Sequence, residues 1–208
     1  MDEIVFDRAR LEEALDALGR EARDAGKVID VAVYGGSCLL LTTDFRRLTR
    51  DVGVAVEDDK EFLFEAARRV GGRLGLPDDW LNDGVRTFLA PDDARARRLF
   101  GAYPDEAEPG LRVFVPTPEY LLAMKLMAMR VDLASGGRDL DDILKLIAVV
   151  GIGRKEDLIN LAAGFYPEAR ISGKLVLGLD GIWQEKEHRD REGRPRPTWQ
   201  SRRGGGAG

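Results

Sequence analysis

The spacing of apolar residues changes at Pro116, and this change limits the folds that the chain can adopt. Before Pro116, short segments such as residues 28–34 (VIDVAVY) alternate and are rich in β-branched side chains, as strands are. After Pro116, apolar residues recur every three or four positions, which is the period of an amphipathic helix. Strands mixed with helices in the first part, and helices alone in the second, predict an α/β protein of the α+β type.

The first part predicts a small mixed sheet with flanking helices. The expected strands are residues 28–34, 49–56, 85–89 and 111–115, and the expected helices are residues 8–23 and 60–74. The segment between the last two strands is rich in proline and polar residues, so it is expected to be a connection. In the second strand, Val52, Val54 and Val56 share one face, which places Asp51 and Gly53 on the other.

The second part predicts a group of helices and then a tail. Thr117 can cap a helix with Pro118 at its first position, and helices are expected at residues 119–133, 138–150 and 155–166. The expected organisation is an α/β core at residues 1–115, a helical part at residues 116–184 and a basic, flexible tail at residues 185–208. Seven basic and three acidic side chains between Lys186 and Arg203 favour either a polyanionic partner for this tail or a solvated end.

Composition and charge argue against several classes of protein. The net charge of −5 argues against binding nucleic acid over the whole surface, and the longest apolar runs fall short of the roughly 20 residues that span a bilayer. The chain does not open with a basic segment followed by an apolar one, so we expect a cytoplasmic protein without a membrane partner. The single cysteine, Cys38, stands beside three leucines and is expected to be a small core residue.

Two motifs in the first part have the spacing of a phosphate-binding turn followed by a metal-binding strand. Gly35-Gly36-Ser37 follows one strand and begins a helix. Glycines let backbone N–H groups approach a phosphate, and a serine there adds a hydroxyl. Carboxylates two residues apart on the next strand would share a face and could hold Mg²⁺. Asp51 stands at the first of these positions, but Gly53 stands at the second.

Lys125 lies on an apolar face of its expected helix. Leucines precede it by four and three residues, and Ala128 and Met129 follow it at the same spacings. A lysine in such a place needs a phosphate or a carboxylate, and Asp139 and Asp142 at the start of the next helix could supply the carboxylate. Two other interpretations stay open: Lys125 extends along its stem to water, and the two aspartates only favour the helix dipole.

These motifs, in this order, resemble the nucleotidyltransferase-like proteins of the AbiEii type, which include toxins of bacterial toxin–antitoxin pairs. The resemblance covers residues 28–150, and it rests on Gly-Gly-Ser, on RLTRDVG at residues 47–53, on LLAMKLMAMR at residues 121–130 and on RDLDD at residues 138–142. It implies a nucleotidyltransferase-type sheet and a metal-dependent enzyme that moves a nucleotide from Mg-NTP to an acceptor. The implied acceptor is the 3′ end of tRNA or a protein, and the implied partner is an antitoxin protein.

The resemblance also implies roles for the residues of the motifs. Asp51 would bind Mg²⁺, Lys125 would contact the triphosphate, and Asp139 or Asp142 would orient that lysine. The nucleotide-binding residues would be Gly35, Gly36, Ser37, Arg47, Thr49 and Arg130. Arg46 and Arg50 flank the same site and could steer a phosphate or simply form a solvated basic edge.

Gly53 departs from the family pattern, in which this strand carries a second carboxylate. Losing one of two metal carboxylates removes much of the charge stabilisation that nucleotidyl transfer needs. The alternative function is therefore a catalytically inactive member that binds a nucleotide or a partner protein. Gly53 could also be an inactivating change in a toxic protein. A third interpretation is an antibiotic-modifying nucleotidyltransferase.

Overall fold

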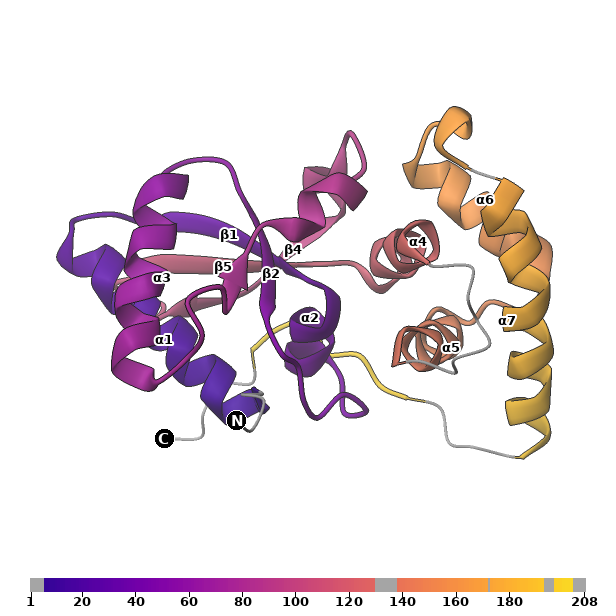
Figure 1. Cartoon of the computed structure of the whole chain (residues 1–208), viewed down its shortest axis with the longest axis horizontal. Helices are drawn as coiled ribbons and strands as arrows, with labels where there is room; N and C mark the ends of the chain where they lie inside the picture. The colour runs from indigo at the N-terminus through magenta and orange to yellow at the C-terminus, as the bar shows by residue number, and fades with distance from the viewer. Residues whose placement is uncertain (1–5, 130–137, 172, 193–196, 204–208) are drawn as a thin grey trace. The chain divides into compact units, whose positions relative to one another are not determined.

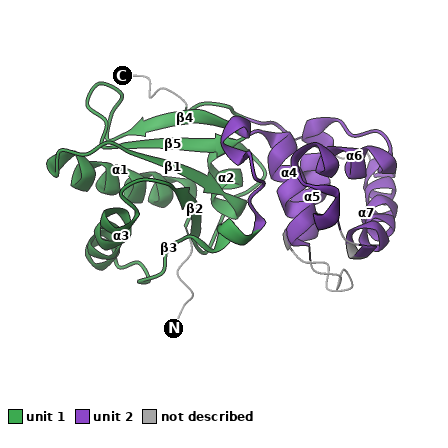
Figure 2. Cartoon of the chain, turned by 90° about the horizontal axis from the view of Figure 1, so that it is seen from above, with its two compact units in different colours: residues 1–87, 97–116, 200–208 green, residues 88–96, 117–199 purple. Residues whose placement is uncertain are grey.

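The computed structural model describes residues 6–129, 138–171, 173–192 and 197–203 (Figure 1). The chain forms two compact units, which are coloured separately in Figure 2. Unit 1 consists of residues 1–87, 97–116 and 200–208, and unit 2 consists of residues 88–96 and 117–199. The two units are therefore interleaved in sequence, and the chain passes between them four times.

Unit 1 is built around a mixed sheet of five strands in the order β3-β2-β1-β5-β4. Its strands are β1 (Ile29–Tyr34), β2 (Val52–Val56), β3 (Leu81–Asn82), β4 (Arg97–Tyr103) and β5 (Leu111–Pro116). Strand β1 runs antiparallel to β2 and parallel to β5, whereas β2 is parallel to β3 and β4 is antiparallel to β5. The α+β class predicted from the sequence is confirmed.

Three helices accompany this sheet: α1 (Arg8–Asp24), α2 (Gly35–Thr42) and α3 (Lys60–Leu74). Helix α1 begins where the sequence predicts, because the Asp7 carboxylate accepts a hydrogen bond from the Arg10 N–H at 2.8 Å. Helices α1 and α3 lie beside one another on one face of the sheet (Figure 2). Trp80 is buried against α3, and its indole N–H donates to the Ala67 carbonyl at 2.9 Å.

Unit 2 contains α4 (Pro118–Ala128), α5 (Arg138–Val150), α6 (Lys155–Phe165) and α7 (Gly173–Arg191). The predicted cap is confirmed: Thr117 accepts from the Tyr120 N–H at 3.3 Å, and Pro118 is the first helical residue. The expected helix 119–133 lies within the described residues only as far as Met129. Segment 88–96 belongs to this unit because the Ala90 N–H donates to the Tyr120 hydroxyl at 2.8 Å and the Tyr166 hydroxyl donates to the Phe88 carbonyl at 2.6 Å.

The sheet differs from the prediction in three places. Residues 85–89 are not a strand: Gly84–Phe88 forms a 3₁₀ helix, because the Gly84 N–H donates to the Asn82 side chain at 3.1 Å and the Arg86 N–H donates to the Asp83 carbonyl at 3.0 Å. The expected connection before residue 111 contains β4, which pairs antiparallel with β5. Leu81–Asn82, which was not among the expected strands, forms the short strand β3 beside β2. The loss of one expected strand and the addition of β3 and β4 give five strands rather than four.

The C-terminal part also differs from the expected flexible tail at residues 185–208. Helix α7 continues to Arg191, so residues 185–191 are its last two turns. Residues 200–203 belong to unit 1: the Gln200 N–H donates to the Thr42 carbonyl and the Arg203 N–H donates to the Phe100 carbonyl, both at 2.6 Å. Within the described residues, every helix is too short or too polar to cross a membrane.

Candidate functional site

The Gly35-Gly36-Ser37 turn begins α2, as the sequence predicts. Gly35 has a positive φ of 65°, which favours glycine, and a Cβ there would meet no atom within 4 Å. A Cβ at Gly36 would lie 2.7 Å from Thr49 Oγ1 and 3.0 Å from Arg46 Nη2. Thr49 and Arg46 therefore lie beside the turn, and Gly36 allows this close approach.

Helix α2 presents only its first turn to a ligand. Residues 37–42 are buried, whereas Gly35 and Gly36 are partly exposed. No side chain caps this helix start, so its first N–H groups carry the partial positive charge of the helix dipole. The geometry suits an anion that contacts backbone N–H groups.

The two hydroxyls that the sequence assigned to this site are directed into the fold. Ser37 is 1% exposed, and its hydroxyl donates to the Tyr34 carbonyl at 2.8 Å. Thr49 is 3% exposed, and its hydroxyl donates to the Asp51 carbonyl at 3.2 Å. Because both hydroxyls bond to nearby backbone carbonyls, a phosphate at the turn would be bound by backbone N–H groups and by the Arg46 guanidinium.

Asp51 and Gly53 lie at the start of β2, where the metal site was expected. Asp51 is exposed directly before the strand, and the Asn82 amide donates to its carboxylate at 2.8 Å. Gly53 is buried and lies opposite Tyr34 on β1 and Asn82 on β3. A Cβ at Gly53 would lie 2.6 Å from Val85 Cγ1. The Val85 side chain thus closes the position where a second carboxylate would begin.

These residues do not complete a Mg²⁺ site. On β2 and beside it, Asp51 offers a carboxylate while Gly53 offers none. Among the residues that the structure describes, there is no group of three His, Cys, Asp or Glu side chains that could hold a metal ion. Divalent cations in nucleotidyl-transfer sites need several oxygen ligands, and here the protein supplies one carboxylate.

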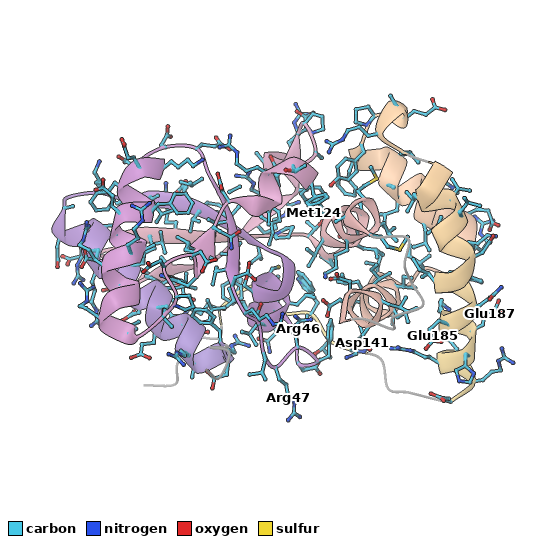
Figure 3. All side chains as sticks on the ribbon, in the orientation of Figure 1. Arg46, Arg47, Met124, Asp141, Glu185 and Glu187 are labelled. Carbon is cyan, nitrogen blue, oxygen red and sulfur yellow. The ribbon has the colours of Figure 1, made fainter. Side chains whose placement is uncertain are left out.

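The structure places Arg46 beside the turn and Arg97 beside Tyr34, the residue before the turn, whereas the sequence assigned Arg47 to the nucleotide site. Arg46 lies beside Gly36, and its Nε donates to the Leu48 carbonyl at 2.8 Å. Arg47 is exposed and extends away from the ribbon (Figure 3). Arg97 donates to the Tyr34 hydroxyl at 3.0 Å with its side chain 14% exposed. Sequence reasoning missed Arg97 because it lies on β4, which was expected to be a connection.

Lys125 forms a partly buried ion pair in unit 2. Its Nζ lies 2.9 Å from Asp142 Oδ2 and 3.0 Å from Asp139 Oδ1. The Lys125 side chain is 12% exposed and that of Asp142 is 2% exposed, whereas Asp139 is 87% exposed. The predicted pairing with a carboxylate is therefore observed, and Asp142 is the buried partner. Arg130 lies outside the described residues.

A second group of charges joins α5 to α7, and sequence reasoning did not single it out. Asp141 lies 2.6 Å from Arg189 and 2.7 Å from Lys145, and Arg189 also lies 2.9 Å from Glu185 (Figure 3). Burial raises the pKa of the Asp141 carboxyl, but hydrogen bonds from Lys145 and Arg189 outweigh it and lower the pKa overall. This group links two helices and is separate from the Lys125 pair.

An open groove of about 650 Å³ lies in unit 1 between α3 and residues 78–83. It is lined by more acidic than basic side chains, and Asn82, the partner of Asp51, is part of its wall. A hydrogen bond from Lys60 lowers the pKa of the Asp83 carboxyl at its edge. The groove is not suited to a triphosphate, because its carboxylates would repel one.

Comparisons of the chain with protein-family models, with curated proteins and with solved structures found no match. The geometric features that remain are an accessible glycine turn with Arg46 beside it in unit 1 and a buried lysine–aspartate pair in unit 2.

Proposed function

We propose that this chain is a nucleotidyltransferase-like protein that binds a nucleoside triphosphate without transferring it. The observation that carries the proposal is the closed position at Gly53, where Val85 occupies the space of a side chain. A protein with the phosphate-binding turn but without the metal pair can bind a nucleotide and lacks the means to neutralise the transition state. This is the inactive alternative given in the sequence analysis.

Phosphate binding is supported by the turn itself. Uncapped N–H groups at the start of α2 attract an anion, and the guanidinium of Arg46 lies where it can add a charge-assisted hydrogen bond. The proposed ligand is a nucleoside triphosphate whose binding does not depend on Mg²⁺.

The resemblance to toxins supports a further part of the proposal, namely that the protein acts in a toxin–antitoxin pair. An inactive member would act by holding nucleotide or by binding a partner protein such as an antitoxin. An active member would transfer a nucleotide to tRNA or to a protein. Transfer activity is therefore the property that separates the two functions.

Calorimetry with the four nucleoside triphosphates, with and without Mg²⁺, tests binding. We expect binding in both conditions, and we expect Arg46→Ala to weaken it by about tenfold, because a charge-assisted hydrogen bond is lost. Arg47→Ala is the matched control, because that arginine is adjacent and points away (Figure 3); it should change affinity by less than about twofold. Absence of heat from all four nucleotides with folded protein would refute nucleotide binding.

Transfer is tested separately with labelled nucleotides and total RNA or protein as acceptors. We expect no transfer by the wild-type chain, and at most weak transfer by Gly53→Asp, because the new side chain must displace a methyl group of Val85. The double variant Gly53→Asp/Val85→Ala opens the position and is expected to gain Mg²⁺ binding. Efficient transfer by the wild-type chain would replace the proposed function with the active one.

A further inference from the structure

Residues 197–203, here called the C-terminal segment, follow α7, and residues 200–203 of the segment belong to unit 1. The Gln200 N–H donates to the Thr42 carbonyl at the end of α2, and the Arg203 N–H donates to the Phe100 carbonyl of β4. Strand β4 is the last strand of the sheet, and its pairing with β5 is irregular between Leu99 and Gly101. The segment thus contacts the edge strand at a point where that strand departs from regular pairing.

The side chain of Arg203 anchors this segment through three kinds of contact. Its Nε lies 3.0 Å from Glu12 Oε2 on α1, and its Nη1 donates to the Ala102 carbonyl at 3.2 Å. Its guanidinium carbon lies 4.1 Å from the centre of the Tyr103 ring, which is fully buried. An ion pair, a carbonyl contact and an aromatic face together suit an arginine and would not suit a lysine equally.

The surface under Arg203 is shaped for close approach. A Cβ at Gly101 would lie 2.9 Å from the Cβ of Arg203, so any larger residue there would push the segment away. Glu12 is held on its other side by Arg8, whose Nε lies 3.3 Å from Oε1. The adjacent Arg202 is exposed. The surface therefore distinguishes between two neighbouring arginines.

We propose that the surface formed by α1 and β4 is a peptide-binding site that recognises an arginine, and that its resident ligand is this chain's own C-terminal segment. The segment contacts this surface through the backbone N–H and the side chain of Arg203, and the Gln200 N–H holds the segment to the end of α2 beside it. The site is remote in sequence from the glycine turn and does not depend on nucleotide binding.

The first test uses the full chain with a cleavage sequence for a specific protease inserted between Glu192 and Pro197. The folded protein is cleaved, separated from its released end, and titrated with a fluorescent peptide of residues 197–203 (PTWQSRR). We expect saturable binding that an Arg203→Ala peptide weakens by at least about tenfold, whereas an Arg202→Ala peptide binds like the original. Failure of the peptide to bind folded, cleaved protein, or equal binding of all three peptides, would overturn the proposal.

The second test leaves the chain uncleaved and measures hydrogen exchange of the Gln200 and Arg203 amides. Arg203→Ala should increase their exchange by about tenfold or more, since the anchor is lost, whereas Arg202→Ala should leave it unchanged. Gly101→Ala should increase exchange without altering any charge, because its methyl group occupies the place of the segment. This test does not require cleavage, so it applies even if the cleaved protein unfolds. Equal exchange of the Gln200 and Arg203 amides in Arg203→Ala and Arg202→Ala would overturn the proposal.

Discussion

Replacing Gly53 by alanine should destabilise the wild-type protein but stabilise a variant that lacks the Val85 side chain. The added Cβ would lie 2.6 Å from Val85 Cγ1 and 3.9 Å from Val85 Cβ. Carbon atoms in contact prefer separations of about 3.5–4.0 Å, so only Cγ1 has to move, by roughly 1 Å. Rotating the valine side chain away from its preferred conformation costs about 0.5–1.5 kcal/mol, and overpacking in general costs about 1–3 kcal/mol.

A gain opposes this cost, because glycine inside a strand is about 0.5–1 kcal/mol less favourable than alanine. We therefore expect Gly53→Ala to lower the free energy of unfolding by about 1 kcal/mol in the wild-type chain. In the Val85→Ala background the contact is absent, and the same change should raise that free energy by about 0.5–1 kcal/mol. The difference between the two effects is a coupling energy of about 2 kcal/mol.

Urea unfolding of the four proteins in this cycle, followed by circular dichroism, measures the coupling. Gly72→Ala on α3 is the matched control, because a Cβ there meets no atom within 4 Å. It should stabilise both backgrounds equally, by up to about 1 kcal/mol. If Gly53→Ala has the same effect with and without Val85, the valine does not obstruct this position, and the observation that supports the proposed inactive function fails.

Three further predictions concern stability. Lys125→Met should destabilise the protein by about 3–5 kcal/mol in urea unfolding, since it leaves the buried Asp142 carboxylate without its cation, and adding Asp142→Asn should recover part of the loss. The Arg73 hydrogen bond lowers the pKa of Glu21, so the ionised Glu21 carboxylate stabilises the folded protein above about pH 4.5, and this stabilisation is lost as the pH falls. The free energy of unfolding of Glu21→Gln should therefore depend less on pH in this range than that of the wild-type protein. Thr117→Ala should cost about 1 kcal/mol by thermal unfolding, and Thr117→Ser should cost much less; equal losses would contradict the capping role.

Local signals in the sequence were sufficient for most of the helices, though not for α7, and for part of the sheet. The start of α4 follows from Thr117 and Pro118 alone, because capping involves only neighbouring residues. Strand β4 was missed because it carries Arg97, Arg98 and a glycine and shows no alternation; its pairing with β5 makes it a strand. Residues 85–89 alternate like a strand, but hydrogen bonds to the preceding turn make them a 3₁₀ helix.

The candidate site was predictable to a similar degree. The glycine turn and its helix follow from the sequence, as does the need of Lys125 for a carboxylate. The inward direction of the Ser37 hydroxyl was not predictable, because it depends on the depth at which α2 is buried. The obstruction of Gly53 by Val85 depends on a tertiary contact between two separate segments, which no local pattern contains.

The interleaving of the two units in sequence has a consequence for how the protein is made. Most of unit 1 is translated before residues 117–199 of unit 2, yet unit 1 also includes residues 200–203, which emerge after helices α4 to α7. During synthesis, the Phe100 carbonyl and the face of the Tyr103 ring therefore lack their Arg203 contacts until residues 117–199 have been translated. An unpaired sheet edge in a nascent chain is a site for wrong association. A ribosome that stopped before Arg203 would release a protein with all its helices and this edge uncovered.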